Sequence, residues 1–227
     1  MIAFSKTYIY RFKNLSCNIF NIMASLQNKF IFLINGLVSL LGWNAVLATF
    51  DYYSSRYPSQ DVYVWFPIPL FLMYVVSGLF WKEIYQRISY KNLIMIGLIA
   101  LNLIMVLLPM VAYIMKDNNL GYGLCLLLCG MIGFFSNIAQ LSCLAVINFM
   151  SVDIVSIFNQ GIAVSGVSMV SLRIIILAIK GPDSSNLQSI IIYTILTIVV
   201  NTLSIALNIK FFSSDEYLNE IYPRMFN

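Results

Sequence analysis

The sequence predicts an all-α fold, a polytopic membrane helical bundle with six transmembrane helices. Of its 227 residues, 60% are hydrophobic and only 10% are charged, which is far from the balance of a soluble domain. Six apolar stretches are each long enough to cross a hydrocarbon core of about 30 Å as a helix. Backbone groups in lipid must pair within their own segment, so these stretches are expected to be helices.

The six predicted spans are joined by short loops that hold most of the charged residues. The spans cover residues 30–50, 62–80, 93–115, 124–148, 157–179 and 189–208. They form one predicted domain, residues 30–209. A basic and aromatic N-terminal segment, residues 1–29, precedes this domain, and residues 210–227 form a cytoplasmic tail or the start of a linker.

The distribution of lysine and arginine predicts the orientation in the membrane. Nine of these residues lie in the N-terminal segment, the second loop and the tail, whereas three lie in the alternate loops and Arg173 lies inside a span. Positive residues concentrate on the cytoplasmic side, so both termini are expected there. We therefore expect an integral multi-pass protein in contact with membrane lipid, with the plasma membrane as the default location.

The N-terminal segment has two interpretations. It contains four basic residues, no acidic residue and several aromatic residues, as in FSKTYIYRFK. Such a segment can lie in the headgroup interface, and transit peptides share the same features. The pattern of basic loops favours an ordinary cytoplasmic leader.

The composition argues against an enzyme. The chain has no histidine, and its nine acidic residues fall almost entirely in the loops and the tail. The usual groups for acid–base, metal or triad chemistry are missing from the spans, so no catalytic residue, metal site or cofactor is predicted. Nucleic acid is not expected as a partner. The cysteines are interpreted as small apolar side chains: Cys17, Cys125, Cys129 and Cys143.

Polar side chains inside the spans indicate a bundle with a polar interior. An amide buried without a partner costs on the order of 1–3 kcal/mol, so each group needs another helix, water or a ligand beside it. These residues are Asn35, Ser39, Asn44, Asn102, Asn137, Gln140, Asn148, Ser165, Ser168, Arg173, Thr197 and Asn201.

The fourth span places three amides on one helical face. These are Asn137, Gln140 and Asn148, and Gly133 lies close to that face one turn earlier. We interpret Asn137 and Asn148 as contacts between helices. For Gln140 a binding role competes with this interpretation, because a carboxamide offers the donors and acceptors that the edge of a nucleobase requires.

The first span contains a tryptophan and an amide side by side. Leu40, Trp43 and Leu47 share one helical face, so they can form a constriction on which a flat ligand stacks. Equally, Trp43 can lie slightly below the aromatic belt, with Asn44 bonded to a neighbouring helix. The periodicity alone gives these two interpretations equal weight.

The fifth span has a ridge of small residues, Gly161, Ser165 and Ser168, which is suited to close helix packing. Arg173 lies deeper than a charge normally does, and we expect it to pair with backbone carbonyls or an asparagine.

Three prolines interrupt the apolar pattern of two other spans. Pro67 and Pro69 lie in the second span and Pro109 lies in the third. Each is expected to kink or loosen its helix, which both a gated and a static bundle tolerate.

Three stretches together resemble the equilibrative nucleoside transporter family. GLVSLLGWNAVLATFDYY is similar to the first helix of that family, NIAQLSCLAVINF to the fourth, and NQGIAVSGVSMVSLRII to the fifth. The resemblance covers residues 30–210. It implies a fold like the N-terminal half of a major-facilitator-like transporter.

The resemblance also implies a function. A nucleoside or nucleobase would sit between two helical bundles that rock to give alternating access. Trp43 would be the outer-gate and stacking residue with Leu40 and Leu47 beside it, and Gln140 would hydrogen-bond the base. Residues 160–166 and Arg173 would be packing elements. No Asp or Glu lies in the six predicted spans, in keeping with downhill transport.

Two departures from the family pattern stand out. Members of the family have eleven spans, so a truncated or half-length chain with six would supply one wall of the cavity. It would need a second helical bundle, missing from this chain, as its partner. Gly42 stands where many relatives carry proline, which bears on the local helix bend.

Two rival functions remain. One is a non-transporting membrane half-carrier, or a structural or regulatory membrane protein that binds a partner through its small-residue faces. The other is a transporter of another small polar solute, because Trp43 and Gln140 suit many flat ligands.

Overall fold

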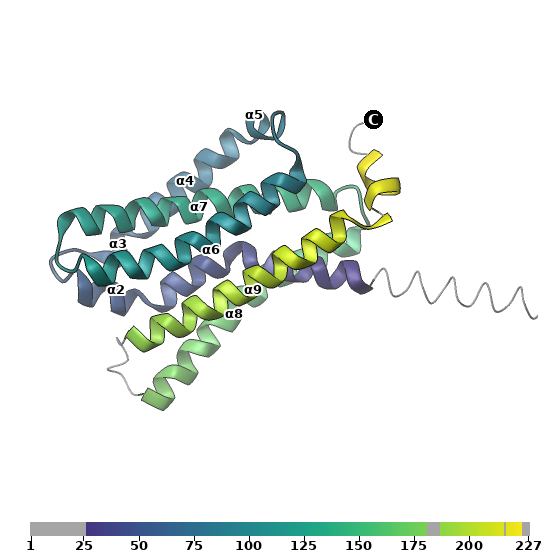
Figure 1. Ribbon diagram of the computed structural model, residues 1–227. Coiled ribbons are helices and arrows are strands. Elements are labelled where there is room, and N and C mark those ends of the chain that lie inside the picture. The colour runs from purple at the N-terminus through teal and green to yellow at the C-terminus, as the bar shows by residue number, and fades with distance from the viewer. Residues whose placement is uncertain (1–25, 181–186, 216, 224–227) are drawn as a thin grey trace, which may run out of the picture.

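The computed structural model describes residues 26–180, 187–215 and 217–223, and these are helical apart from short turns (Figure 1). The first helix, Leu26–Ala48, carries no label in the figure. The labelled elements are α2 (Phe50–Arg56), α3 (Val62–Trp65), α4 (Pro67–Leu79), α5 (Trp81–Tyr85), α6 (Tyr90–Ile114), α7 (Asn119–Ile147), α8 (Val152–Lys180) and α9 (Leu187–Phe212), followed by the π-helix Tyr217–Ile221. The described part of the chain contains no strand, so the all-α prediction is confirmed.

Six helices are long and apolar enough to cross a membrane, which confirms the predicted spans. They are Leu26–Ala48, Val62–Leu79, Tyr90–Ile114, Asn119–Ile147, Val152–Ile179 and Leu187–Phe212. The chain is therefore an integral multi-pass membrane protein. The predicted N-terminal segment lies outside the described residues up to residue 25.

Several helices extend into stretches that were predicted to be loops. α7 begins at Asn119 because the Asn118 side chain caps it, accepting a hydrogen bond of 2.8 Å from the Leu120 N–H. After the first helix, a turn at Thr49 leads directly into α2, which occupies the expected loop. Polar residues near the membrane interface therefore end one helix and start the next, with only a short turn between the two.

The prolines act differently in the two spans that contain them. The second span is divided at Phe66, and Pro67 is the first residue of α4, where its missing N–H costs no helical hydrogen bond. By contrast, α6 continues through Pro109 to Ile114.

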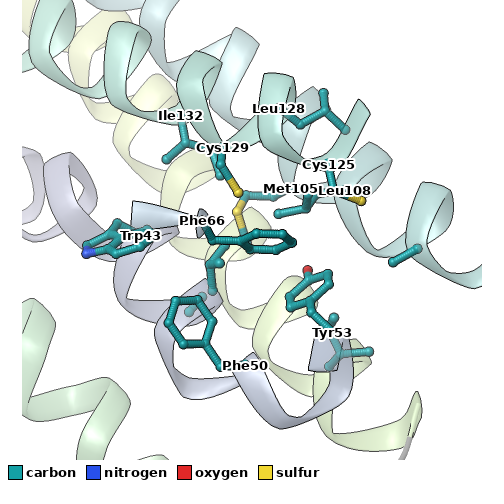
Figure 2. Close-up of a cluster of buried hydrophobic side chains, with 14 of the residues drawn as sticks. Trp43, Phe50, Tyr53, Phe66, Met105, Leu108, Cys125, Leu128, Cys129 and Ile132 are labelled. Atoms are coloured by element: carbon teal, nitrogen blue, oxygen red, sulfur yellow. The ribbon is translucent and has the colours of Figure 1, made fainter. Parts of the chain in front are cut away.

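The apolar core lies where the first helix and α2 meet α6 and α7. Figure 2 shows Phe66 between side chains from these elements, and its ring is completely buried. α7 packs against both α4 and α6, and α9 packs against α6. A Cβ at Gly133 of α7 would lie 2.1 Å from the Leu70 carbonyl oxygen of α4, so these two backbones touch. The expected close approach at Gly133 is confirmed.

Two glycines bring the first helix and α8 into backbone contact. A Cβ at Gly36 would lie 2.0 Å from the Phe158 carbonyl oxygen, and one at Gly161 would lie 2.1 Å from the Leu33 carbonyl oxygen. The small-residue ridge of the fifth span therefore packs as predicted, and only residues without a side chain fit at the crossing.

A buried amide network joins the first helix to α9. Asn35 Nδ2 donates to Asn208 Oδ1 at 3.0 Å, and Asn208 Nδ2 donates back to Asn35 Oδ1 at 2.8 Å. The Ser204 hydroxyl donates to the same Asn35 oxygen at 2.7 Å. All three residues are at most 2% exposed, so this network satisfies polar groups that lipid would leave unpaired.

The cysteines of the described residues are packed as small side chains. Cys125, Cys129 and Cys143 are buried and free. The Cys125 sulfur lies 3.5 Å from the Tyr57 hydroxyl oxygen. Cys17 lies outside the described residues.

Candidate functional site

The indole of Trp43 packs edge to face between two phenylalanines. Its ring centroid lies 5.9 Å from that of Phe50 in α2 and 6.0 Å from that of Phe71 in α4. The side chain is only 8% exposed, so Trp43 is part of the core. Figure 2 shows it at the edge of the core, with the indole nitrogen turned away from the other labelled side chains. Its N–H has no hydrogen-bond partner among the described residues.

Leu40 and Leu47 share the face of Trp43 and differ in exposure. Leu40 is half-buried, and Leu47 is 42% exposed. The face predicted from the periodicity therefore reaches the surface of the bundle, with Trp43 packed behind it. Asn44 points to the neighbouring helix as the alternative interpretation expected, donating to the Ser165 hydroxyl of α8 at 2.9 Å.

Gln140 of α7 is half-buried and is held by a tyrosine of α4. The Tyr74 hydroxyl donates to Gln140 Oε1 at 2.6 Å. The Nε2 of Gln140 has no partner among the described residues, so two N–H donors remain open. The tyrosine fixes the orientation of the carboxamide and leaves its donor side free.

One turn of α4 links the two predicted binding residues. Phe71 contacts Trp43, and Tyr74, three residues later on the same helical face, contacts Gln140. The structure therefore places Trp43 and Gln140 along one side of α4. Neither contact residue was among the predicted site residues, although a tyrosine inside a span is a signal that was available.

The other two amides of α7 behave differently from each other. Asn137 is 4% exposed and donates to the Tyr74 carbonyl at 2.8 Å and to the Ser77 hydroxyl at 2.9 Å, which confirms its predicted role between helices. For Asn148 that prediction is wrong. α7 ends at Ile147, and Asn148 is an exposed residue at the helix end.

The partner of Arg173 differs from the prediction. Instead of a carbonyl or an asparagine, the guanidinium pairs with Asp51 of α2. The other Asp51 oxygen accepts a hydrogen bond of 2.6 Å from the Tyr63 hydroxyl. Asp51 was assigned to a loop, but it lies in the first turn of α2, which brings it to the end of the membrane-spanning region where Arg173 needs a counter-charge.

The exposed sides of α6, α8 and α9 are mostly aliphatic, and α8 also exposes a few polar residues. α8 is the least buried of the six spans, with 17% of its most apolar stretch buried, and it exposes Asn159, Gln160 and Ser171. The large exposed side chains of α6, α8 and α9 are otherwise nearly all aliphatic, and the exposed Thr202 of α9 accepts a hydrogen bond from Asn102 of α6. Acyl chains suit most of this surface, whereas Asn159 and Gln160, near the start of α8, need water, lipid headgroups or protein beside them.

A separate apolar groove of about 250 Å³ lies between α6 and α9. It contains none of the predicted site residues, and its lining is almost wholly apolar. The lining residues are Pro109, Met110, Tyr113, Leu187, Ile190, Ile191, Thr194 and Ile195.

The phenol of Tyr52 lies beyond the end of the first span, beside a basic side chain. Burial raises the pKa of Tyr52 in α2, which the nearby Arg56 partly offsets, so this phenol stays protonated at neutral pH. Among the described residues no group of three or more His, Cys, Asp or Glu is arranged to hold a metal ion.

Comparison with models of known protein families finds no match for this chain, and comparison with curated proteins finds none either.

Proposed function

We propose that this chain forms a six-helix wall of a facilitative carrier for nucleosides or nucleobases in the plasma membrane. Transport is downhill by alternating access, without covalent chemistry. The side of the bundle that carries Trp43, Gln140 and α8 faces the passage. A second helical bundle, as the partner, closes the passage from the opposite side.

The observation that supports this proposal best is a pair of open donors on one side of α4. The indole N–H of Trp43 and the Nε2 of Gln140 have no partner among the described residues, and Phe71 and Tyr74 link the two side chains. The neighbouring α8 exposes Asn159 and Gln160 near the start of its apolar span. A flat polar solute would supply acceptors to the open donors and an aromatic face to the surrounding rings.

The resemblance to the equilibrative nucleoside transporter family is what narrows the solute to nucleosides or nucleobases. Tyr74 gives Gln140 a defined role in such a site, because the carbonyl is held by the phenol and the amide N–H groups point to the solute. A base offers ring nitrogens and carbonyl oxygens as acceptors for them.

A structural or regulatory membrane protein is the second candidate. Two observations favour it: Trp43 is 8% exposed within the core, and the carbonyl of Gln140 already has a protein partner. In that case both side chains would hold helices together, and the polar surface of α8 would bind another membrane protein.

Uptake of labelled adenosine, uridine and hypoxanthine tests the proposal. Cells that express the complete gene encoding this chain are expected to take up at least one of these solutes faster than control cells. Gln140→Ala and Trp43→Ala are each expected to lower the initial uptake rate by roughly tenfold, since each removes a contact to the solute.

Leu103→Ala is the matched control, because Leu103 lies on α6 and is 61% exposed on the aliphatic surface. Its uptake and its level in the membrane should equal those of the unaltered protein. Absence of uptake of all three solutes would contradict the proposed transport function. Normal uptake by both variants would contradict the assignment of Trp43 and Gln140 to the binding site.

A further inference from the structure

The polar contacts at the predicted outer end of the bundle join three elements through one carboxylate. Asp51 of α2 pairs with Arg173 of α8 through one oxygen and accepts a hydrogen bond from Tyr63 of α3 through the other. The side chains of Arg173 and Asp51 are 21% and 44% exposed, so the pair lies partly buried at the surface of the bundle. Both carboxylate oxygens are engaged, which fixes the side chain.

The helical backbone is interrupted at Thr49, two residues before this carboxylate. Thr49 leaves the helical conformation, with φ −120° and ψ 16°, and its hydroxyl donates to the carbonyls of Ala45 and Val46. α2 is therefore a separate short helix that follows the first helix after one non-helical residue. Its first two residues are Phe50 and Asp51.

A continuous series of aromatic contacts runs from this carboxylate to the candidate site. The ring centroid of Tyr63 lies 5.5 Å from that of Phe50, which lies 5.9 Å from that of Trp43. Both pairs are edge to face, an arrangement that depends on ring orientation. A shift of Asp51 therefore moves Phe50 relative to the indole.

We propose that Asp51 and Arg173 are positioning residues: their ion pair holds the start of α2 so that Phe50 covers the indole of Trp43 and closes the site at its outer end. Because Trp43 is the predicted stacking residue, this role rests on the proposed function. Release of the pair uncovers the indole, and its formation covers it again. Arg173 of α8 therefore controls, through Asp51 and Phe50, how far Trp43 of the first helix is exposed.

Fluorescence quenching of Trp43 by acrylamide tests this proposal in the purified protein. The other tryptophans of the chain, Trp65 and Trp81, are replaced by phenylalanine, so that Trp43 is the sole emitter. Asp51→Asn and Arg173→Gln are each expected to raise the quenching constant roughly twofold or more, because the opened segment admits water. The emission maximum is expected to move to longer wavelength.

Two further variants separate positioning from a general loss of structure. Asp51→Glu keeps the carboxylate and should retain most of the shielding of Trp43. The exchange Asp51→Arg with Arg173→Asp should restore shielding relative to either single change. Asp153→Asn removes the carboxylate of another ion pair, which joins Asp153 to Lys29 at 3.9 Å, and should leave the quenching unchanged.

The outcomes distinguish this role from the proposed function. Unchanged quenching in folded Asp51→Asn and Arg173→Gln variants overturns the positioning role, whatever the uptake assay gives. If these variants do not fold, recovery of a folded, shielded protein by the charge exchange supports the role, and failure to recover overturns it. If the variants alter the quenching but the protein transports no nucleoside or nucleobase, the positioning role is supported and the proposed function is contradicted.

Discussion

Replacement of Gly161 by leucine is expected to prevent assembly of the bundle. Any Cβ at this position would lie 2.1 Å from the Leu33 carbonyl oxygen and 2.9 Å from the Leu37 nitrogen, both of which belong to the backbone of the first helix. Backbone atoms cannot rotate away as a side chain does, so the two helices must separate. Separation also breaks the hydrogen bond between Asn44 and Ser165. We expect a loss of roughly 3 kcal/mol or more in the free energy of unfolding.

The buried thiols provide the measurement for this prediction. In a Cys17→Ser background the remaining thiols, Cys125, Cys129 and Cys143, are buried in the folded protein, so a thiol-reactive fluorescent dye reports unfolding as the temperature rises. Gly123→Ala is the matched control, because a Cβ there meets no atom within 4 Å. Its midpoint should be unchanged or slightly higher, since alanine favours a helix over glycine by about 1 kcal/mol. An equal midpoint for Gly161→Leu and Gly123→Ala would contradict the backbone contact.

Removal of the Asn35 amide is expected to have the second largest effect on stability. Asn35→Leu deletes three hydrogen bonds and leaves the polar groups of Asn208 and Ser204 buried without their partner on the first helix. Both residues are 0% exposed, so water does not replace the lost bonds. We expect a loss of about 2 kcal/mol in the free energy of unfolding, measured by the same thiol assay.

The double variant Asn35→Leu with Asn208→Leu tests the physical cause of that loss. Replacing both amides also removes the Asn208 amide that the single change leaves without its partner, and apolar pairs of similar shape are close to neutral in such an exchange. The double variant should therefore be more stable than Asn35→Leu alone. Additive losses from the two substitutions would show that the amides do not act as a pair.

Much of the fold could be predicted from the sequence because lipid restricts the choice of structure. Long apolar stretches in hydrocarbon must be helices, so all six spans were found. Helical periodicity also located residues that face a neighbouring helix, as the contacts of Gly161, Asn137 and Asn44 show. The helix ends were less predictable, because capping and turns near the interface depend on single side chains. Asn148 shows this, since α7 ends at Ile147, one residue before the predicted end, and Asn148 is exposed.

Pairing between distant helices could not be predicted from the sequence. Periodicity gives the face of a helix on which a residue lies but not which helix that face meets. Arg173 and Asp51 are 122 positions apart, and Asn35 and Asn208 are 173 apart. For the same reason the sequence suggested Gln140 as a binding residue without showing that Tyr74 holds its carbonyl.

Cysteine accessibility at Gln140 tests most directly whether this side of the bundle faces a passage filled with water. Gln140→Cys is placed in a Cys17→Ser background and treated, in intact cells, with a small cationic methanethiosulfonate reagent that requires water and an ionisable thiol. Leu103→Cys on the aliphatic surface of α6 is the control. We predict that Gln140→Cys reacts, that Leu103→Cys does not, and that adenosine slows the reaction at Gln140→Cys. If the Gln140→Cys thiol is as unreactive as the one at Leu103→Cys, Gln140 does not face a water-filled passage. The polar contacts of the protein would then serve only to join its helices.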